Sequence, residues 1–174
     1  FDRDAPRIFG RDGTFGESAM QFMAPPDVDD PKLAKLRSRP GKDSGKLIVY
    51  HGNSDAVFSV NDTARWFARL QANAGSDATG FSRFYPVPGM AHCSGGPATD
   101  QMDLVDALVA WVERGQAPEA VVARARGPGS AVPNPEVPAS WSPARTRLLC
   151  PYPQVPRYTG RGDTESAASF ACAA

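Results

Sequence analysis

The chain has 174 residues and a mass of 18.5 kDa, which is the size of one domain with a substantial core. Hydrophobic residues make up 41% and charged residues 22%, and both fractions are typical of globular proteins. The 19 basic and 19 acidic side chains give zero net charge, which argues against nucleic acid or a membrane surface as the partner. No apolar run approaches the roughly 20 residues that span a bilayer.

Residues 1–45 are polar and repeatedly interrupted by proline and glycine, so we expect an irregular segment that packs against another part of the protein. The helix that we predict there runs over 31–37, with Asp30 as its N-terminal cap. Acidic residues gather at Asp27, Asp29 and Asp30, but the glycine and the terminal glutamate of an EF-hand calcium loop are missing.

Residues 46–126 carry the regular elements. The apolar run 46–50 stands between two glycines and is typical of a short strand buried on both faces. A helix is predicted over about 61–74, with Gly75 as its stop. The side of this helix that we expect to face the core consists of Ala64, Phe67, Ala68 and Gln71.

The second half of this region repeats the pattern. Residues 84–87 form the second predicted strand, which Pro88 and Gly89 close. Asp100 then caps a long helix that ends at Gly115 and has an apolar ridge at helical spacing. The ridge consists of Leu104, Val105, Leu108, Val109 and Val112. Alternating strands and helices predict an α/β domain of parallel strands with right-handed crossover helices, and two strands are too few for a complete sheet.

Residues 127–174 are rich in proline, glycine and serine, and we predict an irregular tail there. The three cysteines are Cys93, Cys150 and Cys172. In a reducing compartment all three would be small buried residues, whereas in an exported protein two would pair and the third would need a partner outside the chain. Closing the loop between Cys150 and Cys172 would add roughly 3 kcal/mol of stability, and this favours an oxidising compartment.

The first candidate site directly follows the first predicted strand. Asp55 stands in the loop at the carboxyl end of this strand, where α/β folds keep ligand-binding and catalytic groups. The same position also suits a turn former or a helix cap. His51, beside Gly52, is expected to be structural, with its ring hydrogen-bonded near the end of the strand.

The second candidate site follows the second strand in the same way. The bend at Pro88 and Gly89 brings His92 to the same rim of the sheet as Asp55, because neighbouring parallel strands end on the same side. In a catalytic triad, the carboxylate holds the imidazole tautomer and supports the imidazolium that forms. The α/β-hydrolase order is serine, acid, histidine, and this chain supplies the last two. For His92 alone a structural role would be favoured, and only the pairing with Asp55 makes the catalytic role an equal alternative.

No residue of the chain fits the nucleophile well. The Gly-x-Ser-x-Gly elbow does not occur, and Ser94 directly follows Cys93 in a loop that no strand enters. Cys93 as a thiol nucleophile is the other option, although sequence neighbours such as Cys93 and His92 seldom point at each other productively. Two histidines and three cysteines without tight spacing do not predict a zinc site. The Arg-Gly-Asp run at 161–163 is interpreted as a turn and not as an adhesion motif.

Three blocks of the sequence together resemble the C-terminal third of the tannase and feruloyl esterase family. They are 46–55 (KLIVYHGNSD), 87–96 (VPGMAHCSGG) and 147–158 (RLLCPYPQVPRY). The tail 160–172 continues the match, so the resemblance covers about 30–172. It implies the C-terminal part of an α/β-hydrolase fold with an irregular Pro/Gly-rich tail. It also implies a secreted serine hydrolase with a large lid before the acid, acting on esters of aromatic acids such as ferulate, gallate or terephthalate.

The resemblance also implies roles for individual residues. Asp55 matches the triad acid and His92 matches the general base. Cys93 matches a cysteine that forms a disulfide with the cysteine just before the nucleophilic serine, while Cys150 and Cys172 match a pair joined to each other. The serine block, the oxyanion hole and most of the lid are absent from this chain. We therefore expect no cofactor here, and a structural calcium would belong to the absent lid.

We interpret the chain as the C-terminal part of a secreted or periplasmic esterase that hydrolyses aromatic carboxylic esters through an acyl-serine. The expected partners are a small aromatic ester and the N-terminal part of the same enzyme, and neither nucleic acid nor a membrane. The alternative is a non-catalytic module that keeps the scaffold's helices and the disulfide, and serves only association or folding.

Overall fold

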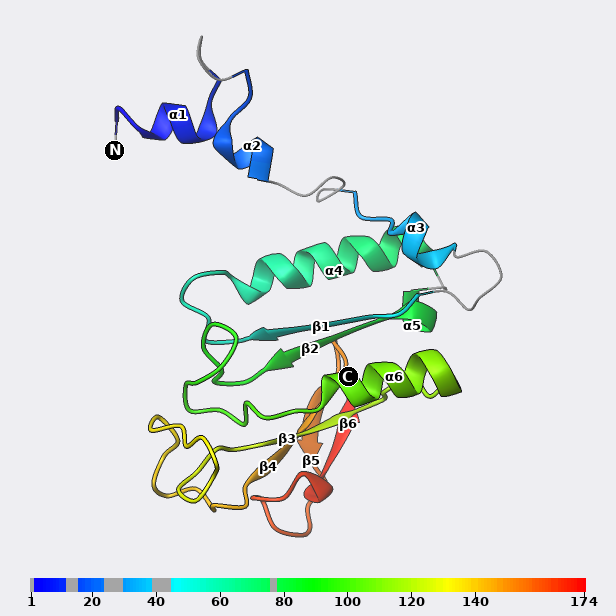
Figure 1. Ribbon diagram of the computed structural model, residues 1–174. Coiled ribbons are helices and arrows are strands. Elements are labelled where there is room, and N and C mark those ends of the chain that lie inside the picture. The colour runs from blue at the N-terminus through cyan, green and yellow to red at the C-terminus, as the bar shows by residue number, and fades with distance from the viewer. Residues whose placement is uncertain (1, 12–15, 24–29, 39–44, 76–77) are drawn as a thin grey trace.

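The computed structural model describes residues 2–11, 16–23, 30–38, 45–75 and 78–174. Figure 1 shows two parallel strands with a long helix on either side, and the strands of the C-terminal part beyond the second helix. Among the described residues, none of the helices combines the length and the apolar character that crossing a bilayer requires. The regular part is layered as helix, sheet, helix, which is the arrangement that alternating strands and helices predict.

The two parallel strands are β1 (Leu47–Gly52) and β2 (Ser82–Val87), connected through α4 (Val60–Ala74) and the short α5 (Ala78–Phe81). They pair in register along their whole length, so both end at the same edge, as predicted. The expectation that the first strand is buried on both faces is wrong for this chain. Tyr50 is 44% exposed, and within the described ranges β1 pairs with β2 alone.

Helix α4 covers one face of the two strands. Its N-terminal cap is Ser59, whose hydroxyl accepts a hydrogen bond from the Asn61 amide at 3.2 Å. Its buried residues are Phe67, Leu70 and Ala74. The predicted core-facing side is therefore confirmed at Phe67 and wrong at Ala68, which is exposed because the buried side continues through Leu70 instead.

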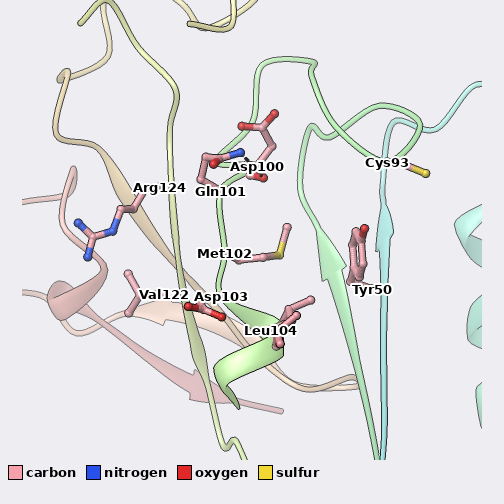
Figure 2. A pocket seen from close by; sticks show the side chains of 10 residues that line it. Tyr50, Cys93, Asp100, Gln101, Met102, Asp103, Leu104, Val122 and Arg124 are labelled. Atoms are coloured by element: carbon pink, nitrogen blue, oxygen red, sulfur yellow. Dashed lines mark hydrogen bonds between the residues drawn. The ribbon is translucent and has the colours of Figure 1, made fainter. Parts of the chain in front are cut away.

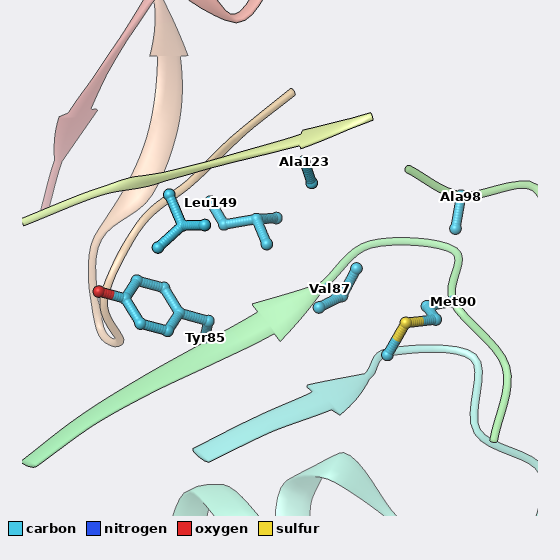
Figure 3. Close-up of a cluster of buried hydrophobic side chains, with 7 residues drawn as sticks. Tyr85, Val87, Met90, Ala98, Ala123 and Leu149 are labelled. Carbon is cyan, nitrogen blue, oxygen red and sulfur yellow. The ribbon is translucent and has the colours of Figure 1, made fainter. Parts of the chain in front are cut away.

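Two buried clusters hold the sheet to the layers on its two faces. On the α4 side, Phe84 of β2 packs against Phe67 with ring centroids 5.7 Å apart. On the other side, the cluster in Figure 3 joins β2 and the loop after it to the C-terminal strands. Because Met90 and Ala98 belong to this cluster, the loop that carries His92 is anchored in the core on both sides of His92. Its buried members are Tyr85, Val87, Met90, Ala98, Val121, Ala123 and Leu149.

Helix α6 (Leu104–Arg114) differs from the prediction in its start and in its burial. Its cap is Asp103, whose side chain accepts a backbone amide hydrogen bond. Asp100 is not the cap, because its carboxylate is bound by Arg126. Trp111 is the buried residue of the helix. Much of the predicted ridge is uncovered in the described part of the chain: Val105, Val109 and Val112 are 72%, 40% and 49% exposed.

The C-terminal part contains strands that the sequence analysis did not predict. They are β3 (Val121–Arg124), β4 (Thr146–Leu149), β5 (Val155–Tyr158) and, after the short helix η2 (Ala167–Ser169), β6 (Phe170–Ala173). β3 pairs antiparallel with β4, and β5 pairs antiparallel with β6. The expectation of an irregular tail over 127–174 is therefore wrong for three of these strands, which are too short to show a clear alternation of apolar and polar residues.

Cys150 and Cys172 form a disulfide, with their Cα atoms 5.5 Å apart. Cys150 directly follows β4, and Cys172 lies within β6. The bond therefore links the two antiparallel pairs and closes a segment with a sequence separation of 22 residues.

Replacing Cys150 and Cys172 together with serine is expected to lower the free energy of unfolding by roughly 3 kcal/mol, because the unfolded chain regains loop entropy. Urea unfolding of the oxidised protein measures the difference. The control is the wild-type protein in reducing buffer, which should match the variant. Peptide mapping without reduction should recover Cys150 bound to Cys172, and recovery of Cys93 in that bond would contradict the assignment.

Three short helices form the described parts of the N-terminal segment. They are α1 (Ala5–Phe9), α2 (Ala19–Met23) and α3 (Ala34–Arg37). Figure 1 shows α1 and α2 extending away from the two parallel strands. Several apolar side chains of α1 and α2 suit contact with another part of the protein: Phe9, Phe22 and Met23 are 66%, 77% and 75% exposed.

The helix predicted over 31–37 begins later than expected, at Ala34. Asp30 does not cap it, because the Asp30 carboxylate accepts a hydrogen bond from the Asn73 side chain at 2.8 Å and pairs with Lys32. The other two members of the acidic cluster, Asp27 and Asp29, lie outside the described residues.

Candidate active site

Two loops meet at the carboxyl end of the parallel strands. Residues 53–59 lead from β1 into α4, and residues 88–103 lead from β2 into α6. The Ser54 amide of the first loop donates a hydrogen bond to the Met90 carbonyl of the second at 3.0 Å. A Cβ atom at Gly52 would lie 2.2 Å from the same carbonyl oxygen, so the close approach of the loops requires glycine. This contact brings both candidate site residues to one place.

Asp55 and His92 are joined by a direct hydrogen bond. Asp55 Oδ2 lies 2.8 Å from His92 Nδ1, and the Asp55 side chain is only 4% exposed. Asp55 Oδ1 accepts hydrogen bonds from the amides of Val57 and Phe58 at 2.8 and 3.0 Å. One oxygen therefore closes a turn while the other holds the imidazole. The bond from His92, together with the two amides, holds the pKa of Asp55 well below its usual range, although burial opposes this shift.

The His92 imidazole leaves its second nitrogen open. Because the Asp55 carboxylate only accepts hydrogen bonds, Nδ1 carries a proton, and Nε2 of the neutral ring keeps its lone pair. The His92 side chain is 47% exposed, and no residue in the described ranges bonds to Nε2. The Phe58 ring packs beside the imidazole, with ring centroids 5.4 Å apart. A neutral imidazole in this state can take a proton from a hydroxyl placed at Nε2.

His51 also contacts Asp55, and the sequence analysis missed this contact. His51 Nε2 lies 3.2 Å from Asp55 Oδ2 and 3.1 Å from the Phe58 carbonyl oxygen, while Nδ1 lies 2.8 Å from Thr63 Oγ1. Both oxygens at Nε2 are acceptors, so Nε2 donates and the Thr63 hydroxyl donates to Nδ1. With both nitrogens engaged, His51 has the hydrogen-bonded structural role expected for it, and it supports the Asp55 carboxylate.

Cys93 and Ser94 follow His92 in an exposed stretch of the loop. The Cys93 thiol is free and exposed, and the backbone φ of this residue is 65°. Ser94 is exposed as well. Among the hydrogen bonds of the described residues, neither side chain reaches the His92 imidazole. The described part of the chain thus places no nucleophile at Nε2.

An open groove of about 610 Å³ lies beside the loop that follows His92 (Figure 2). Neither Asp55 nor His92 lines it, so the groove borders the loop and not the reacting nitrogen. Exposed Val105 of α6 forms part of its wall, and the groove is therefore continuous with the uncovered ridge of α6. The lining residues are Tyr50, Cys93, Asp100, Gln101, Met102, Asp103, Leu104, Val105, Val122 and Arg124.

The other patterns singled out in the sequence give no further site. Within the described residues, no three histidine, cysteine, aspartate or glutamate side chains are grouped to hold a metal ion. The Arg-Gly-Asp run at 161–163 lies between β5 and η2. There the Tyr158 hydroxyl donates to the Gly162 carbonyl at 2.9 Å, and Asp163 accepts the Glu165 amide at 2.8 Å. The run therefore forms a turn, as predicted.

Comparison with known proteins gives a consistent family match. The family model for tannase and feruloyl esterase matches residues 12–173. Mono(2-hydroxyethyl) terephthalate hydrolase from Piscinibacter sakaiensis is 47% identical over 174 residues, which are 100% of this chain and 26% of that protein. A probable feruloyl esterase from Arthroderma benhamiae is 31% identical over 174 residues, which are 98% of this chain and 28% of that protein.

A solved structure shares the same arrangement. The crystal structure of feruloyl esterase B from Aspergillus oryzae matches with a TM-score of 0.58 and 30% sequence identity. The match covers 75% of this chain and 27% of that chain. In these comparisons, the chain spans between a quarter and a third of the length of each relative.

Proposed function

Because the chain belongs to the tannase and feruloyl esterase family, we propose that it supplies the acid and the base of a serine esterase that hydrolyses aromatic carboxylic esters. Its fold is the C-terminal part of an α/β-hydrolase. The observation that carries the proposal is the 2.8 Å hydrogen bond between Asp55 and His92 Nδ1, which leaves Nε2 open. This is the geometry of the acid–base pair in a catalytic triad.

In the proposed reaction, His92 Nε2 takes the proton of a serine hydroxyl while the serine oxygen attacks the ester carbonyl carbon. The Asp55 carboxylate stabilises the imidazolium that results. His92 then gives this proton to the leaving alcohol oxygen, as the carbon–oxygen bond of the ester breaks and the acyl-serine remains. Water then attacks the carbonyl carbon of the acyl-serine while His92 removes a proton from it. His92 gives this proton to the serine oxygen as the bond between that oxygen and the acyl carbon breaks and the carboxylic acid leaves. The proposed steps use no cofactor of this chain.

We place the nucleophilic serine and the oxyanion hole outside residues 1–174. Support comes from the loop after His92, where neither Cys93 nor Ser94 reaches the imidazole in the described part. The exposed Cys93 thiol supports a disulfide with a cysteine beside that serine, which would tie the base to the nucleophile. Such a bond and the Cys150–Cys172 disulfide both support a secreted or periplasmic enzyme.

The proposed substrates are small esters of aromatic acids: feruloyl, galloyl or related phenolic and terephthalate esters. The names of the relatives support this class, because one is named a mono(2-hydroxyethyl) terephthalate hydrolase, one a probable feruloyl esterase and one a feruloyl esterase B. The proposed partner is the N-terminal part of the same enzyme. A structural calcium would be bound in the lid of that part. That part would cover the exposed side chains of α6 and the edge of β1 that no described strand pairs with.

A fluorophosphonate probe tests this proposal in the complete enzyme, because the probe bonds to a serine that a base activates. We expect one labelled serine, outside residues 1–174, and no label after His92→Ala. Ser94→Ala is the matched control and should leave labelling and methyl ferulate turnover within about twofold, as for other exposed substitutions. A label on Ser94 would contradict the placement of the nucleophile.

The second candidate function is a non-catalytic association or folding module. It is favoured by the exposed apolar residues of α6, which suit binding to another chain. Under this alternative, His92→Ala would leave both the labelling and the turnover of the partner chain unchanged. The same probe experiment therefore separates the two functions.

A further inference from the structure

The turn that follows His92 has an unusual backbone. Cys93, Gly95 and Gly96 have positive φ values of 65°, 77° and 74°. Cysteine rarely adopts this conformation, so contacts from the surrounding structure must hold the turn in place. A Cβ atom at Gly96 would lie 2.2 Å from the Gly89 carbonyl oxygen, which shows how tightly the turn is folded onto the start of its loop.

Two carboxylates hold this turn through its backbone amides. Asp100 Oδ2 accepts a hydrogen bond from the Gly95 amide, and Glu136 Oε2 accepts one from the Gly96 amide, both at 2.8 Å. The Asn134 side-chain amide donates to the Gly96 carbonyl at 2.8 Å. Asn134 and Glu136 lie in the segment between β3 and β4. Asn134 and Glu136, from the C-terminal part of the chain, therefore bind the loop that carries His92, the proposed base.

Asp100 is itself fixed by Arg126. The guanidinium donates to both carboxylate oxygens, from Nε at 3.0 and 3.1 Å and from Nη2 at 2.5 Å. The Asp100 side chain is 0% exposed and that of Arg126 is 17% exposed. Burial raises the pKa of Asp100, but the hydrogen bonds from Arg126 and the Gly95 amide outweigh it and hold the pKa below its usual value. The carboxylate is therefore a fixed anion at neutral pH.

One further hydrogen bond connects the turn to His92. The Gly95 carbonyl accepts the Ala91 amide at 3.2 Å, and Ala91 directly precedes His92. A series of contacts therefore leads from Asp100 through Gly95 to the backbone of His92. Neither carboxylate bonds to the imidazole itself in the residues that the structure describes. Any effect of the two carboxylates on the base must act through the backbone.

We propose that Asp100 and Glu136 are positioning residues that keep His92 aligned with the serine by fixing the turn at Gly95 and Gly96. This inference rests on the proposed function, because it takes His92 as the general base. A misplacement of about 1 Å can cost about 100-fold in rate. Loss of either carboxylate should lower kcat and leave KM nearly unchanged, since binding of the ester does not require an aligned Nε2.

Three variants of the complete enzyme test the positioning role, with kcat, KM for methyl ferulate and melting temperature as readouts. Glu136→Ala and Asp100→Asn are expected to lower kcat by about 10- to 100-fold with KM within about twofold. Arg126 donates to both Asp100 oxygens, so the NH₂ group in Asp100→Asn would face a donor, and the side chain would lose the position from which it holds Gly95. Glu136→Gln keeps a carbonyl oxygen that can accept the Gly96 amide, so it should restore most of kcat. Glu136 is exposed, and its variants therefore test the proposal even where Asp100→Asn fails to fold.

Glu165→Gln provides a matched control. Glu165 pairs with Arg145 in the C-terminal part, and their side chains are 27% and 14% exposed. Glu165 has no hydrogen bond to the loop of His92 among the described residues. This variant should change the melting temperature and leave kcat unchanged. The proposal is overturned when Glu136→Ala keeps the wild-type kcat, or when its loss of kcat is no larger than that of Glu165→Gln.

His92→Ala separates failure of this inference from failure of the proposed function. Full turnover by His92→Ala would overturn both. Loss of turnover in His92→Ala, with wild-type kcat in Glu136→Ala and Asp100→Asn, would overturn the positioning role alone. In the residual activity of His92→Ala, adding Glu136→Ala should have no further effect, because a residue that acts through His92 then has nothing to position. An equal loss in both backgrounds would overturn the inference.

Discussion

Replacing His92 with alanine in the complete enzyme is expected to lower kcat by about 10⁴- to 10⁶-fold, as loss of the base does in other triads. Without the imidazole, none of the described groups that contact Asp55 can take the proton of the serine, because both ring nitrogens of His51 are engaged. The His92 side chain is 47% exposed, so the variant should still fold. Loss of its hydrogen bond to Asp55 should lower the melting temperature only modestly. Steady-state kinetics and thermal melting measure the two effects.

His51→Ala is the control for this experiment, because His51 contacts the same Asp55 oxygen from the other side. Both of its ring nitrogens are engaged, so its loss should cost about 1–2 kcal/mol of stability and reduce the rate far less than loss of His92. If His51→Ala abolished turnover with normal melting while His92→Ala did not, the assignment of the base would be wrong.

The sequence correctly predicts those strands and helices that are determined by residues within or next to the element. Strand β1 and the 84–87 part of β2 are apolar runs closed by glycine or proline, and α4 ends at a glycine, so local pattern is enough there. The start of α6 is different. Asp100 and Asp103 both precede the ridge, and only the contact with Arg126, far along the chain, shows that Asp103 is the cap.

The strands of the C-terminal part could not be predicted in the same way. β4, β5 and β6 have four residues each, and β4 and β5 lie among prolines. Their pairing depends on partners that are distant in sequence, such as β3 for β4, and on the disulfide between Cys150 and Cys172. Because these contacts join residues far apart in the sequence, no short sequence pattern predicts them.

The same distinction holds at the site. Parallel strands end at one edge, so the positions of Asp55 and His92 after two such strands predict that they meet, and the structure brings them within 2.8 Å. The contacts of Asp100 and Glu136 with Gly95 and Gly96 are side-chain bonds to backbone amides, and such bonds leave no periodic signal. The four-residue spacing of His51 and Asp55 across a tight turn is a signal that could have revealed their contact.

Asp55→Asn is expected to lower kcat by about 10⁴-fold, nearly as much as loss of the base. The amides of Val57 and Phe58 donate to Asp55 Oδ1, so the oxygen of the new amide must remain there. The NH₂ group then faces His92 Nδ1, which must accept a hydrogen bond, and the ring proton moves to Nε2. In this tautomer Nε2 has no lone pair for the serine proton. Steady-state kinetics with methyl ferulate checks the loss, and wild-type kcat in Asp55→Asn would contradict the acid role.

The stability of the same variant should depend on pH in a defined direction. The pKa of Asp55 is lowered in the folded protein, chiefly by its hydrogen bond with His92, relative to about 3.9 in an unfolded chain. Its contribution to stability is therefore fully present above the unfolded value and is lost as the pH falls through the lower, folded one. Asp55→Asn should melt below the wild type at about pH 6, and the gap should shrink at about pH 3. A gap that stays constant over this range would mean that the Asp55 carboxylate is not held by His92.

Because Asp55 stays ionised well below neutral pH, a loss of rate between about pH 7 and pH 5 must come from another group.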